Sequence, residues 1–474
     1  MPENPSLPWW KLLNRYHWFV ILVASAAWFF DCLDQRIFTL ARVPALTELM
    51  KPVLTGDRLV DDKLVDAAGK EVTAWFLIGW GIGGMIFGSL GDKFGRAKML
   101  TISILIYSAF TGLSFISKTA MDFSICRFLT GLGVGGVFGL AVSLIAETVP
   151  AGARAQSLGL LQVLSTIGNI TAGLCKLLID NLENGGTITK GHGWRWMFLI
   201  GALPALMVIF TGRFLKEPAS WLNLKAKGLL PKGGIFAPYA SLMGSARWRK
   251  NLIVGALIAS TGVVGLWAIG EYAPALQTSV FTSHYVGEAV KDGRIAAADA
   301  TADASKKIVK PQVDRAIFWA YICNMVGAGF GMMAFTRVAG AFGRRTAFAI
   351  GFSAALIITL LVYWKLTSPP IAYVMMFFLG AAQLSVFAGF AIYLPELFPS
   401  RLRSTGTSFC YNLGRFAAAA GSFGSAALAT KLFGQYAAPL PQRYSAMTMC
   451  AIFLIGLVTT IFAPETKGQP LPEE

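Results

Sequence analysis

Ionisable side chains stand inside long apolar stretches of this sequence, where charge is costly. Asp31 and Asp34 share one such stretch, and Arg127 and Arg415 lie in two others. A charge buried in an apolar medium is strongly unfavourable unless a partner offsets it, so each residue is a functional candidate. Burial raises the pKa of a carboxyl group and a nearby arginine lowers it, so a carboxylate with a breakable basic partner can carry a proton. These residue types predict proton transfer at the aspartates and anion binding at an arginine.

Counting helical rise predicts that three of these charges lie within one helical turn of each other in depth. Asp31 stands about 20 Å from one end of its stretch, at 1.5 Å per residue, and Asp34 lies one turn further. The stretch that holds Arg127 runs the other way, so this arginine also lies about 20 Å from that side. We expect Arg127 to pair with Asp31 or Asp34 and to control proton coupling there. The alternative is a static ion pair that joins two helices.

Arg415 lies near the middle of its stretch, and no acidic residue of the second half is expected at that depth. A planar guanidinium matches a carboxylate in bidentate fashion, so the carboxyl group of a substrate is its expected partner. A structural pairing with Asp31, Asp34 or Glu271 is the alternative. Polar and aromatic residues are weaker candidates for the same cavity, each with ordinary helix packing as its alternative: Gln162, Asn169, Trp267, Asn324, Gln383, Tyr411 and Asn412.

The composition indicates that the segments containing these residues lie in a membrane. Of 474 residues, 55% are hydrophobic and 14% are charged, whereas soluble domains carry about 25% charged residues. Apolar runs of about 20 residues can cross a hydrocarbon core as helices. Twelve runs are predicted, at 16–42, 72–92, 97–116, 120–146, 154–178, 194–215, 252–276, 315–338, 345–365, 371–394, 402–432 and 442–463.

The net charge of +16 reflects membrane topology. Lysine and arginine gather in the short loops that an even number of helices places on one side, which predicts cytoplasmic termini by the positive-inside rule. The charge therefore does not indicate nucleic acid. The first run is expected to remain as a membrane helix. Six cysteines occur singly, which indicates neither disulfides nor a metal site.

Glycines mark the run 120–146. Gly131, Gly135 and Gly139 recur every four residues and therefore share one helix face. Small residues on a shared face let a neighbouring helix approach closely. We expect tight helix packing there.

An internal repeat divides the chain into two halves. The pattern Glu-x-x-Pro-x-x-x-Arg follows the fourth run, with Glu147 and Arg154, and returns after the tenth run with Glu396 and Arg403. A compact basic turn, GSLGDKFGRAK, follows the second run, and GAFGRR follows the eighth. The second turn is degenerate, because a glycine stands where the first has its aspartate.

These motifs, in this order, resemble the major facilitator superfamily of transporters. Further markers are R-x-x-x-G-x-G-x-G from Arg127, the segment WRW at 194–196 and the segment PETKG at 464–468. Within the superfamily they resemble the sugar-porter, aromatic-acid/proton symporter and sialate/lactate branches. The Asp-x-x-Asp element resembles D-G-Y/F-D of the latter two, with Cys32 and Leu33 in place of glycine and the aromatic residue.

The resemblance implies an all-α polytopic membrane protein with twelve transmembrane helices in two pseudo-symmetric halves of six. The expected domains are an N-terminal bundle at 1–215, a cytoplasmic linker at 216–250 with short helical pieces, and a C-terminal bundle at 251–474. The substrate site is expected between the halves. Segments 43–71 and 278–314 are expected to be long outer loops, and the stretch 296–307 of the second is expected to be either a small exposed helix or partly disordered.

The resemblance also implies a cytoplasmic gate. Asp92 is expected to face the start of helix eleven, where free N–H groups favour a carboxylate. Arg96 is expected to contact Glu147, and Arg344 to contact Glu396. Arg154 and Arg403 complete the predicted gate.

We therefore expect a secondary active transporter in the plasma membrane that carries a small organic anion, a carboxylate or acidic sugar, together with a proton. The alternatives are a transporter of neutral sugars or polyols and a non-transporting membrane sensor. No enzymatic activity, cofactor or metal is expected. The predicted partners are the small-molecule substrate, the proton and the lipid bilayer, and the chain is expected to work as a monomer.

Overall fold

A computed structural model describes residues 8–53, 55–270, 272–299, 302–437 and 439–473. The described residues are mostly helical and contain no strand, as predicted. They form two compact units. The first unit contains the residues up to 256, residues 390–413 and residues from 466 onward, and the second contains residues 257–389 and 414–465. The division into bundles at 1–215 and 251–474 stays a prediction.

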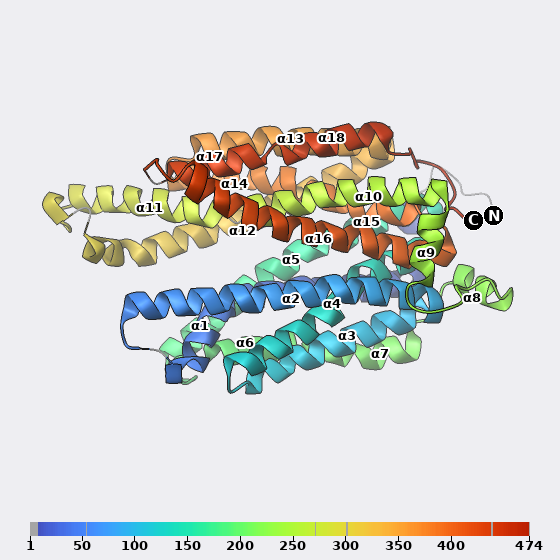
Figure 1. The fold of residues 1–474 in the computed structure, drawn as a ribbon, viewed down its shortest axis with the longest axis horizontal. Helices are drawn as coiled ribbons and strands as arrows, with labels where there is room; N and C mark the ends of the chain where they lie inside the picture. Colours follow the sequence, from blue (N-terminus) through green and yellow to red (C-terminus); the bar gives the residue numbers. More distant parts are fainter. Residues whose placement is uncertain (1–7, 54, 271, 300–301, 438, 474) are drawn as a thin grey trace. The chain divides into compact units, whose positions relative to one another are not determined.

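The first unit is built around a buried helix, α4, which packs against α1, α2 and α3. Figure 1 shows α2, α3 and α4 lying along one another within this unit. Its helices are α1 (Arg15–Leu49), α2 (Arg58–Phe94), α3 (Arg96–Leu113), α4 (Ala120–Thr148), α5 (Ala151–Asn184), α6 (Gly193–Gly201), α7 (Met207–Phe214), α8 (Ala219–Ala226) and α9 (Ala237–Gly244), with parts of α10 (Ala246–Val264), α15 (Ser385–Glu396) and α16 (Arg403–Ala427).

The second unit packs α12 against α14 and α13 against α18. Its first membrane segment, α10, is followed by a π-helical turn at Gly265–Ile269 and then by α11. A second π-helical turn, at Leu428–Leu432, follows α16. The remaining helices are α11 (Tyr272–Lys291), α12 (Asp303–Phe342), α13 (Arg344–Lys365), α14 (Pro369–Gln383), α17 (Leu440–Met449) and α18 (Ile452–Phe462).

The helices follow the predicted apolar runs. Among the described residues, 11 helical segments are long and apolar enough to cross a membrane. The helix α16 occupies the eleventh predicted run and completes the twelve-helix fold. The sixth run contains α6 and α7, and the twelfth contains α17 and α18.

The first predicted outer loop, 43–71, is mostly helical, so this prediction was wrong. The helix α1 continues to Leu49, and α2 already begins at Arg58. An ion pair one turn apart, with Lys70 Nζ at 2.7 Å from Asp66 Oδ2, stabilises the polar start of α2. Hydropathy detects only the part of a helix that lies in the bilayer, so polar extensions escape it.

In the second segment, 278–314, the prediction of a long loop was wrong for the same reason, whereas the helical alternative for 296–307 is confirmed in part, from Asp303 onward. The helix α11 extends to Lys291, and α12 begins at Asp303. Lys310 Nζ lies 2.5 Å from Asp314 Oδ2, again one helical turn apart. These polar residues therefore form helix ends that extend beyond the apolar runs.

The predicted close packing at the glycines of α4 is confirmed. Cβ atoms built on Gly131 and Gly135 would overlap main-chain atoms of α2, including the carbonyl oxygen of Trp80. A Cβ on Gly139 would instead overlap the side chain of Ser408 on α16. These glycines bring α2 and the first half of α16 against α4.

Replacing Gly135 with alanine is expected to lower stability by about 1–3 kcal/mol, the usual cost of overpacking. The added Cβ meets rigid main-chain atoms that cannot move aside. Gly212→Ala is the control, because no atom lies within 4 Å of a Cβ built at that helical position. Thermal unfolding of both purified variants measures the difference, and equal midpoints would contradict this packing.

The predicted linker contains two short helices, α8 and α9, as expected. Most of its side chains are exposed, but a few large ones are buried. Trp221 of α8 and Leu242 of α9 are buried within the first unit. The linker is therefore packed onto the ends of the membrane helices.

Candidate functional site

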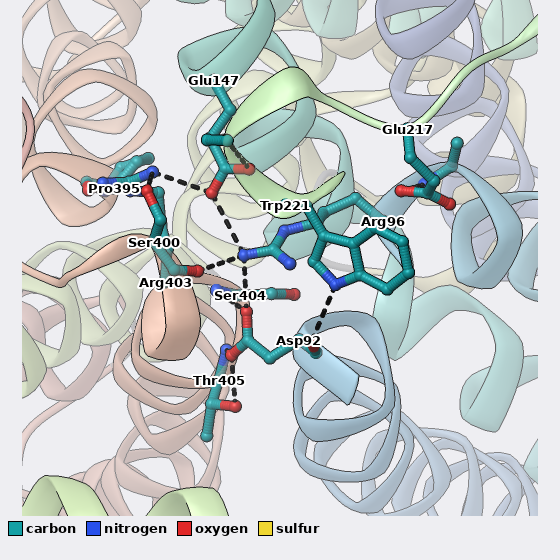
Figure 2. A network of polar contacts seen from close by, with 12 residues as sticks. Asp92, Arg96, Glu147, Glu217, Trp221, Pro395, Ser400, Arg403, Ser404 and Thr405 are labelled. Atoms are coloured by element: carbon teal, nitrogen blue, oxygen red, sulfur yellow. Dashed lines mark hydrogen bonds and ion pairs between the residues drawn. The ribbon is translucent and has the colours of Figure 1, made fainter. Parts of the chain in front are cut away.

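Four charged side chains meet at one end of α2, α3, α4 and α16 (Figure 2). Arg96 Nη2 lies 3.0 Å from Asp92 Oδ1 and 3.1 Å from Glu147 Oε1. Arg403 Nη1 lies 2.7 Å from the same Glu147 oxygen. All four side chains are completely buried. We call these four residues the charge cluster. The predicted contact of Arg96 with Glu147 is present.

Asp92 binds the N-terminus of α16, as predicted. The N–H groups of Ser404 and Thr405 donate to its two carboxylate oxygens at 3.1 and 2.8 Å, and the Thr405 hydroxyl donates at 2.6 Å. The first N–H groups of a helix have no partner within the helix and carry partial positive charge. The carboxylate satisfies two of them and joins α2 to α16.

The linker closes over the charge cluster. Ser220 Oγ donates to Glu147 Oε2 at 3.0 Å, and Trp221 Nε1 donates to the carbonyl oxygen of Asp92 at 2.9 Å. Further along, Tyr239 donates to the carbonyl oxygen of Met85 at 2.7 Å. Burial raises the pKa of Tyr239, so its hydroxyl remains a donor. These contacts hold the linker against α2 and α4.

The internal repeat is visible in the contacts of its arginines. Arg154 Nε donates to the carbonyl oxygen of Ala146 at 2.9 Å, and Arg403 Nε donates to that of Pro395 at 3.0 Å. Each acceptor directly precedes the glutamate of its own copy of the repeat. The two copies therefore share one local geometry.

The basic turns of the repeat also share a geometry. Gly95 and Gly343 both adopt positive φ, at +113° and +96°, before α3 and α13, a conformation that favours glycine. Glu217 accepts N–H bonds from the first turn of α3 at 3.2 and 3.0 Å. Glu465 accepts the corresponding bonds from α13 at 2.9 and 3.1 Å. Both glutamates cap a helix N-terminus.

The predicted contact between Arg344 and Glu396 joins residues of different units and stays a prediction. Arg344 Nη1 donates to the carbonyl oxygen of Ala339 at 2.9 Å within the second unit. In the first unit, Thr466 Oγ1 donates to Glu396 Oε2 at 2.6 Å.

A second charged site lies within the predicted membrane depth. Arg127 Nη1 is 3.5 Å from Asp34 Oδ2, and both side chains are fully buried. Thr111 Oγ1 donates to the other oxygen of Asp34 at 2.8 Å, and Arg127 Nη2 donates to Ser114 Oγ at 2.9 Å. Of the two predicted acidic partners, Asp34 forms the ion pair with Arg127 at this distance. Asp31 is equally buried, one turn earlier on α1.

Four residues of the first unit form a buried aromatic and amide group. Trp28 Nε1 donates to Gln162 Oε1 at 2.7 Å. Tyr411 stacks on Phe138 with ring centroids 3.9 Å apart, and its ring lies 6.1 Å from that of Trp28. Of this group, Gln162 and Tyr411 were predicted to line the substrate cavity.

The two remaining candidates of this unit contact their own helices. Asn412 Nδ2 donates to the carbonyl oxygen of Ser408 at 2.8 Å, and Asn169 Nδ2 donates to that of Ser165 at 3.0 Å. Asn412 is fully buried, whereas Asn169 is half-buried.

The second unit contains the other predicted substrate residues. Asn324 Nδ2 donates to a main-chain carbonyl of α14 at 3.0 Å, and Gln383 Nε2 donates to Thr359 Oγ1 at 3.0 Å. Trp267 stands in the π-helical turn and is half-buried. Arg415 is 5% exposed. A cavity that these residues share with the first unit stays a prediction.

Comparison with known proteins decides the family. Residues 63–231 and 306–473, more than two thirds of the chain, match the family described as sugar (and other) transporter. The chain belongs to this family. It is a transporter of the major facilitator superfamily, as the sequence motifs predicted.

Solved structures and curated relatives agree with this membership. The fold of this transporter matches that of the proton:xylose symporter XylE with a TM-score of 0.70, at 20% identity over 97% of this chain and 98% of the other. A cis,cis-muconate transport protein of Acinetobacter baylyi is 27% identical over 83% of this chain and 84% of the relative. The sialic acid transporter NanX of Escherichia coli is 25% identical over 75% of each.

Sequence reasoning missed several residues that complete the charge cluster of this transporter. Glu217 could have been found from the repeat, because it follows the sixth helix as Glu465 follows the twelfth. Ser220 and Trp221 lie directly after it but carry no repeat signal. Thr405 lies two residues after Arg403, at a helix start where a hydroxyl side chain is common.

Proposed function

We propose that this transporter carries a small organic anion, a carboxylate or an acidic sugar, together with a proton by alternating access. The observation that carries the proposal is the buried pair of Asp34 and Arg127. An ionisable pair at membrane depth is costly unless it serves a function. The cargo itself undergoes no chemical change in this proposal.

The proton would reside on Asp34, with Asp31 as a second carboxylate on the same helix. Arg127 favours the ionised form of a carboxylate, and burial favours the protonated form. A small change in their separation during transport would therefore shift the balance. The 3.5 Å distance between Arg127 Nη1 and Asp34 Oδ2 supports a contact that can break.

The anion would bind Arg415, with support from Tyr411, Asn412, Gln383, Gln162, Asn169, Asn324 and Trp267. Muconate and sialic acid, named for two relatives, are both carboxylates. A guanidinium recognises a carboxylate through two parallel hydrogen bonds. These relatives therefore favour an anionic cargo.

The charge cluster would act as the gate on the cytoplasmic side, with both termini on that side of the plasma membrane. Buried ion pairs among Asp92, Arg96, Glu147 and Arg403 would hold the gate closed and separate when it opens. Arg154, Arg344 and Glu396 belong to the same proposed gate. We propose a functional monomer.

A transporter of neutral sugars or polyols is the second candidate. It is favoured by the family description and by the likeness of the fold to a xylose symporter. In that case Arg415 would have a structural role, and the amide and aromatic residues would bind the cargo.

Replacing Arg415 with alanine distinguishes the two candidates. We expect carboxylate uptake to fall about tenfold or more, because a hydrogen bond to a charged group contributes about 1.5–3 kcal/mol. The measurement is uptake of muconate, sialic acid and xylose into proteoliposomes, with and without an imposed pH gradient. Arg249→Ala, at an exposed arginine, is the control. Undiminished carboxylate uptake by Arg415→Ala would exclude the anion site, and uptake that ignores the gradient would exclude proton coupling.

A further inference from the structure

Three aromatic rings surround the guanidinium of Arg127. Its Cζ lies 4.6 Å from the ring centroid of Phe198, 5.8 Å from that of Phe38 and 5.9 Å from that of Phe123. The rings come from α6, α1 and α4, and all three are buried. Phe123 and Phe198 also contact each other edge to face, with centroids 5.4 Å apart. We call Phe38, Phe123 and Phe198 the aromatic cage.

The hydrogen bonds of Arg127 are few for a buried guanidinium. Its contact with Asp34 is 3.5 Å long, whereas Arg403 lies 2.7 Å from Glu147 in the charge cluster. Arg127 also donates to the neutral hydroxyl of Ser114, and its Nε has no hydrogen-bond partner among the described residues. The negative faces of aromatic rings attract a cation, most strongly where water is excluded. The aromatic cage supplies this attraction.

Protonation of Asp34 would remove the formal negative charge that balances Arg127. A guanidinium left alone in a dry site is strongly destabilised, and this cost would oppose protonation. The aromatic cage lowers the cost, because the rings attract the cation whether or not the carboxylate is charged. The rings stabilise Arg127 more strongly when Asp34 is protonated, because the carboxylate then no longer competes for the guanidinium. They therefore favour proton binding to Asp34.

We propose that the aromatic cage holds the charge of Arg127 while Asp34 carries its proton, with Phe198 as the principal positioning residue. This inference rests on the proposed function, in which Asp34 is the proton carrier. The cage makes the ion pair reversible, because Arg127 keeps the rings as favourable partners when Asp34 loses its charge. Phe198 contacts neither proton nor cargo in this proposal and acts through Arg127.

The arrangement follows from spacing along the helices. Phe123 stands four residues before Arg127 on α4, and Phe38 stands four residues after Asp34 on α1. Residues four apart share a helix face, so each charged residue brings a ring of its own helix. Phe198 is the ring that a third helix contributes, and it lies nearest to the guanidinium.

Other titratable groups also face this pair. Asp31 lies one turn from Asp34 on α1, and Tyr107 of α3 is close enough to interact electrostatically with both carboxylates. Cys126 adjoins Arg127 on α4. From α6, the main chain at Gly201 approaches Asp34, since a Cβ built there would lie 3.3 Å from its Oδ1. A test must therefore isolate the signal of Asp34.

Fluorination of Phe198 is the sharpest test. A trifluorinated phenylalanine keeps nearly the same shape but strongly reduces the negative electrostatic potential of the ring face. It therefore weakens the cation contact while retaining the packing. The full-length purified protein is titrated by infrared spectroscopy, which distinguishes a protonated carboxyl group from a carboxylate. Subtracting the spectra of Asp34→Asn isolates the signal of Asp34. The same fluorinated residue at Phe352, a buried ring stacked on Phe348, is the matched control.

We expect the midpoint of the Asp34 titration to move to lower pH by about one unit, a tenfold change in proton binding, when Phe198 is fluorinated. Phe198→Leu is expected to shift it in the same direction. An unchanged midpoint in the fluorinated protein would overturn the proposal. An equal shift from the Phe352 control would also overturn it, because the effect would then not depend on the cage.

The infrared titration is independent of transport, so it separates this inference from the proposed function. A shifted Asp34 midpoint in a protein whose uptake ignores the pH gradient would support the cage and contradict proton coupling. Gradient-driven uptake with an unshifted midpoint would support coupling and overturn the cage.

Discussion

An Asp34→Asn variant is expected to lose accumulation of its cargo against a concentration gradient while still exchanging cargo across the membrane. Asparagine retains the size of the side chain and can accept the hydrogen bond from Thr111, but it cannot carry the proton. A difference of about two pH units stores about 2.7 kcal/mol per proton, enough for about 100-fold accumulation of a cargo coupled to one proton. Accumulation is therefore expected to fall by about 100-fold, to equal concentrations on the two sides. Uptake of a labelled carboxylate into proteoliposomes measures it.

Exchange of labelled for unlabelled cargo shows whether the variant is folded, because it requires binding and alternating access but no net proton movement. Asp314→Asn, at an exposed carboxylate that pairs with Lys310, is the matched control and is expected to accumulate cargo like the wild type. Full accumulation by Asp34→Asn would exclude this carboxylate as the carrier. If Asp31→Asn alone abolishes accumulation, the proton resides one turn earlier on α1.

The membrane pair could be predicted from sequence because depth is a count along one axis. A fixed rise per residue places Arg127 level with Asp31 and within one helical turn of Asp34 on an antiparallel helix, and an apolar surrounding leaves a buried charge few partners. The contact of Asp92 with the start of α16 followed from the family resemblance and is confirmed by two N–H bonds. In both cases helix geometry or a known motif supplied the spatial information needed to predict which residues lie close together.

Contacts between side chains of neighbouring helices at the same depth could not be predicted in this way. The repeat makes Glu147 the counterpart of Glu396 and Arg403 the counterpart of Arg154. It does not indicate that Glu147 of one copy contacts Arg403 of the other at 2.7 Å. The aromatic cage could not be predicted either, because the chain has 34 phenylalanines and nothing in their spacing marks three of them as neighbours of Arg127. Which three surround Arg127 depends on how α1, α4 and α6 are rotated about their axes.

The linker illustrates a different limit of sequence reasoning. Lysines and glycines favoured a surface connector, and its short helices are confirmed. However, single aromatic residues determine how it packs: Trp221 and Tyr239 each donate to a main-chain carbonyl of α2. A low density of apolar residues therefore does not exclude docking when a few large side chains find acceptors at helix ends.

Replacing Glu147 with glutamine is expected to destabilise the transporter by about 3–5 kcal/mol, the usual cost of leaving a buried charge without its partner. One carboxylate oxygen of Glu147 lies 3.1 Å from Arg96 and 2.7 Å from Arg403. Without its charge, Asp92 alone must balance two buried guanidiniums. The end of α16 is then expected to separate from α2 and α4, because hydration of the arginines becomes more favourable than burial. Thermal unfolding measures the loss of stability.

Opening of the charge cluster can be observed separately from unfolding. Ser404 is fully buried beside Asp92, so a Ser404→Cys variant in a background without the native cysteines is expected to resist thiol reagents. Adding Glu147→Gln is expected to expose this thiol. Glu183→Gln is the control, since Glu183 lies at the opposite end of α5 and accepts an N–H bond from Gly193 there at 3.1 Å. Combining Glu147→Gln with Arg403→Gln restores neutrality, so the double variant should lose less stability than the sum of the single variants. Additive losses, or a thiol that stays protected, would mean that packing of α16 against the glycines of α2 and α4 holds this end closed without the charges.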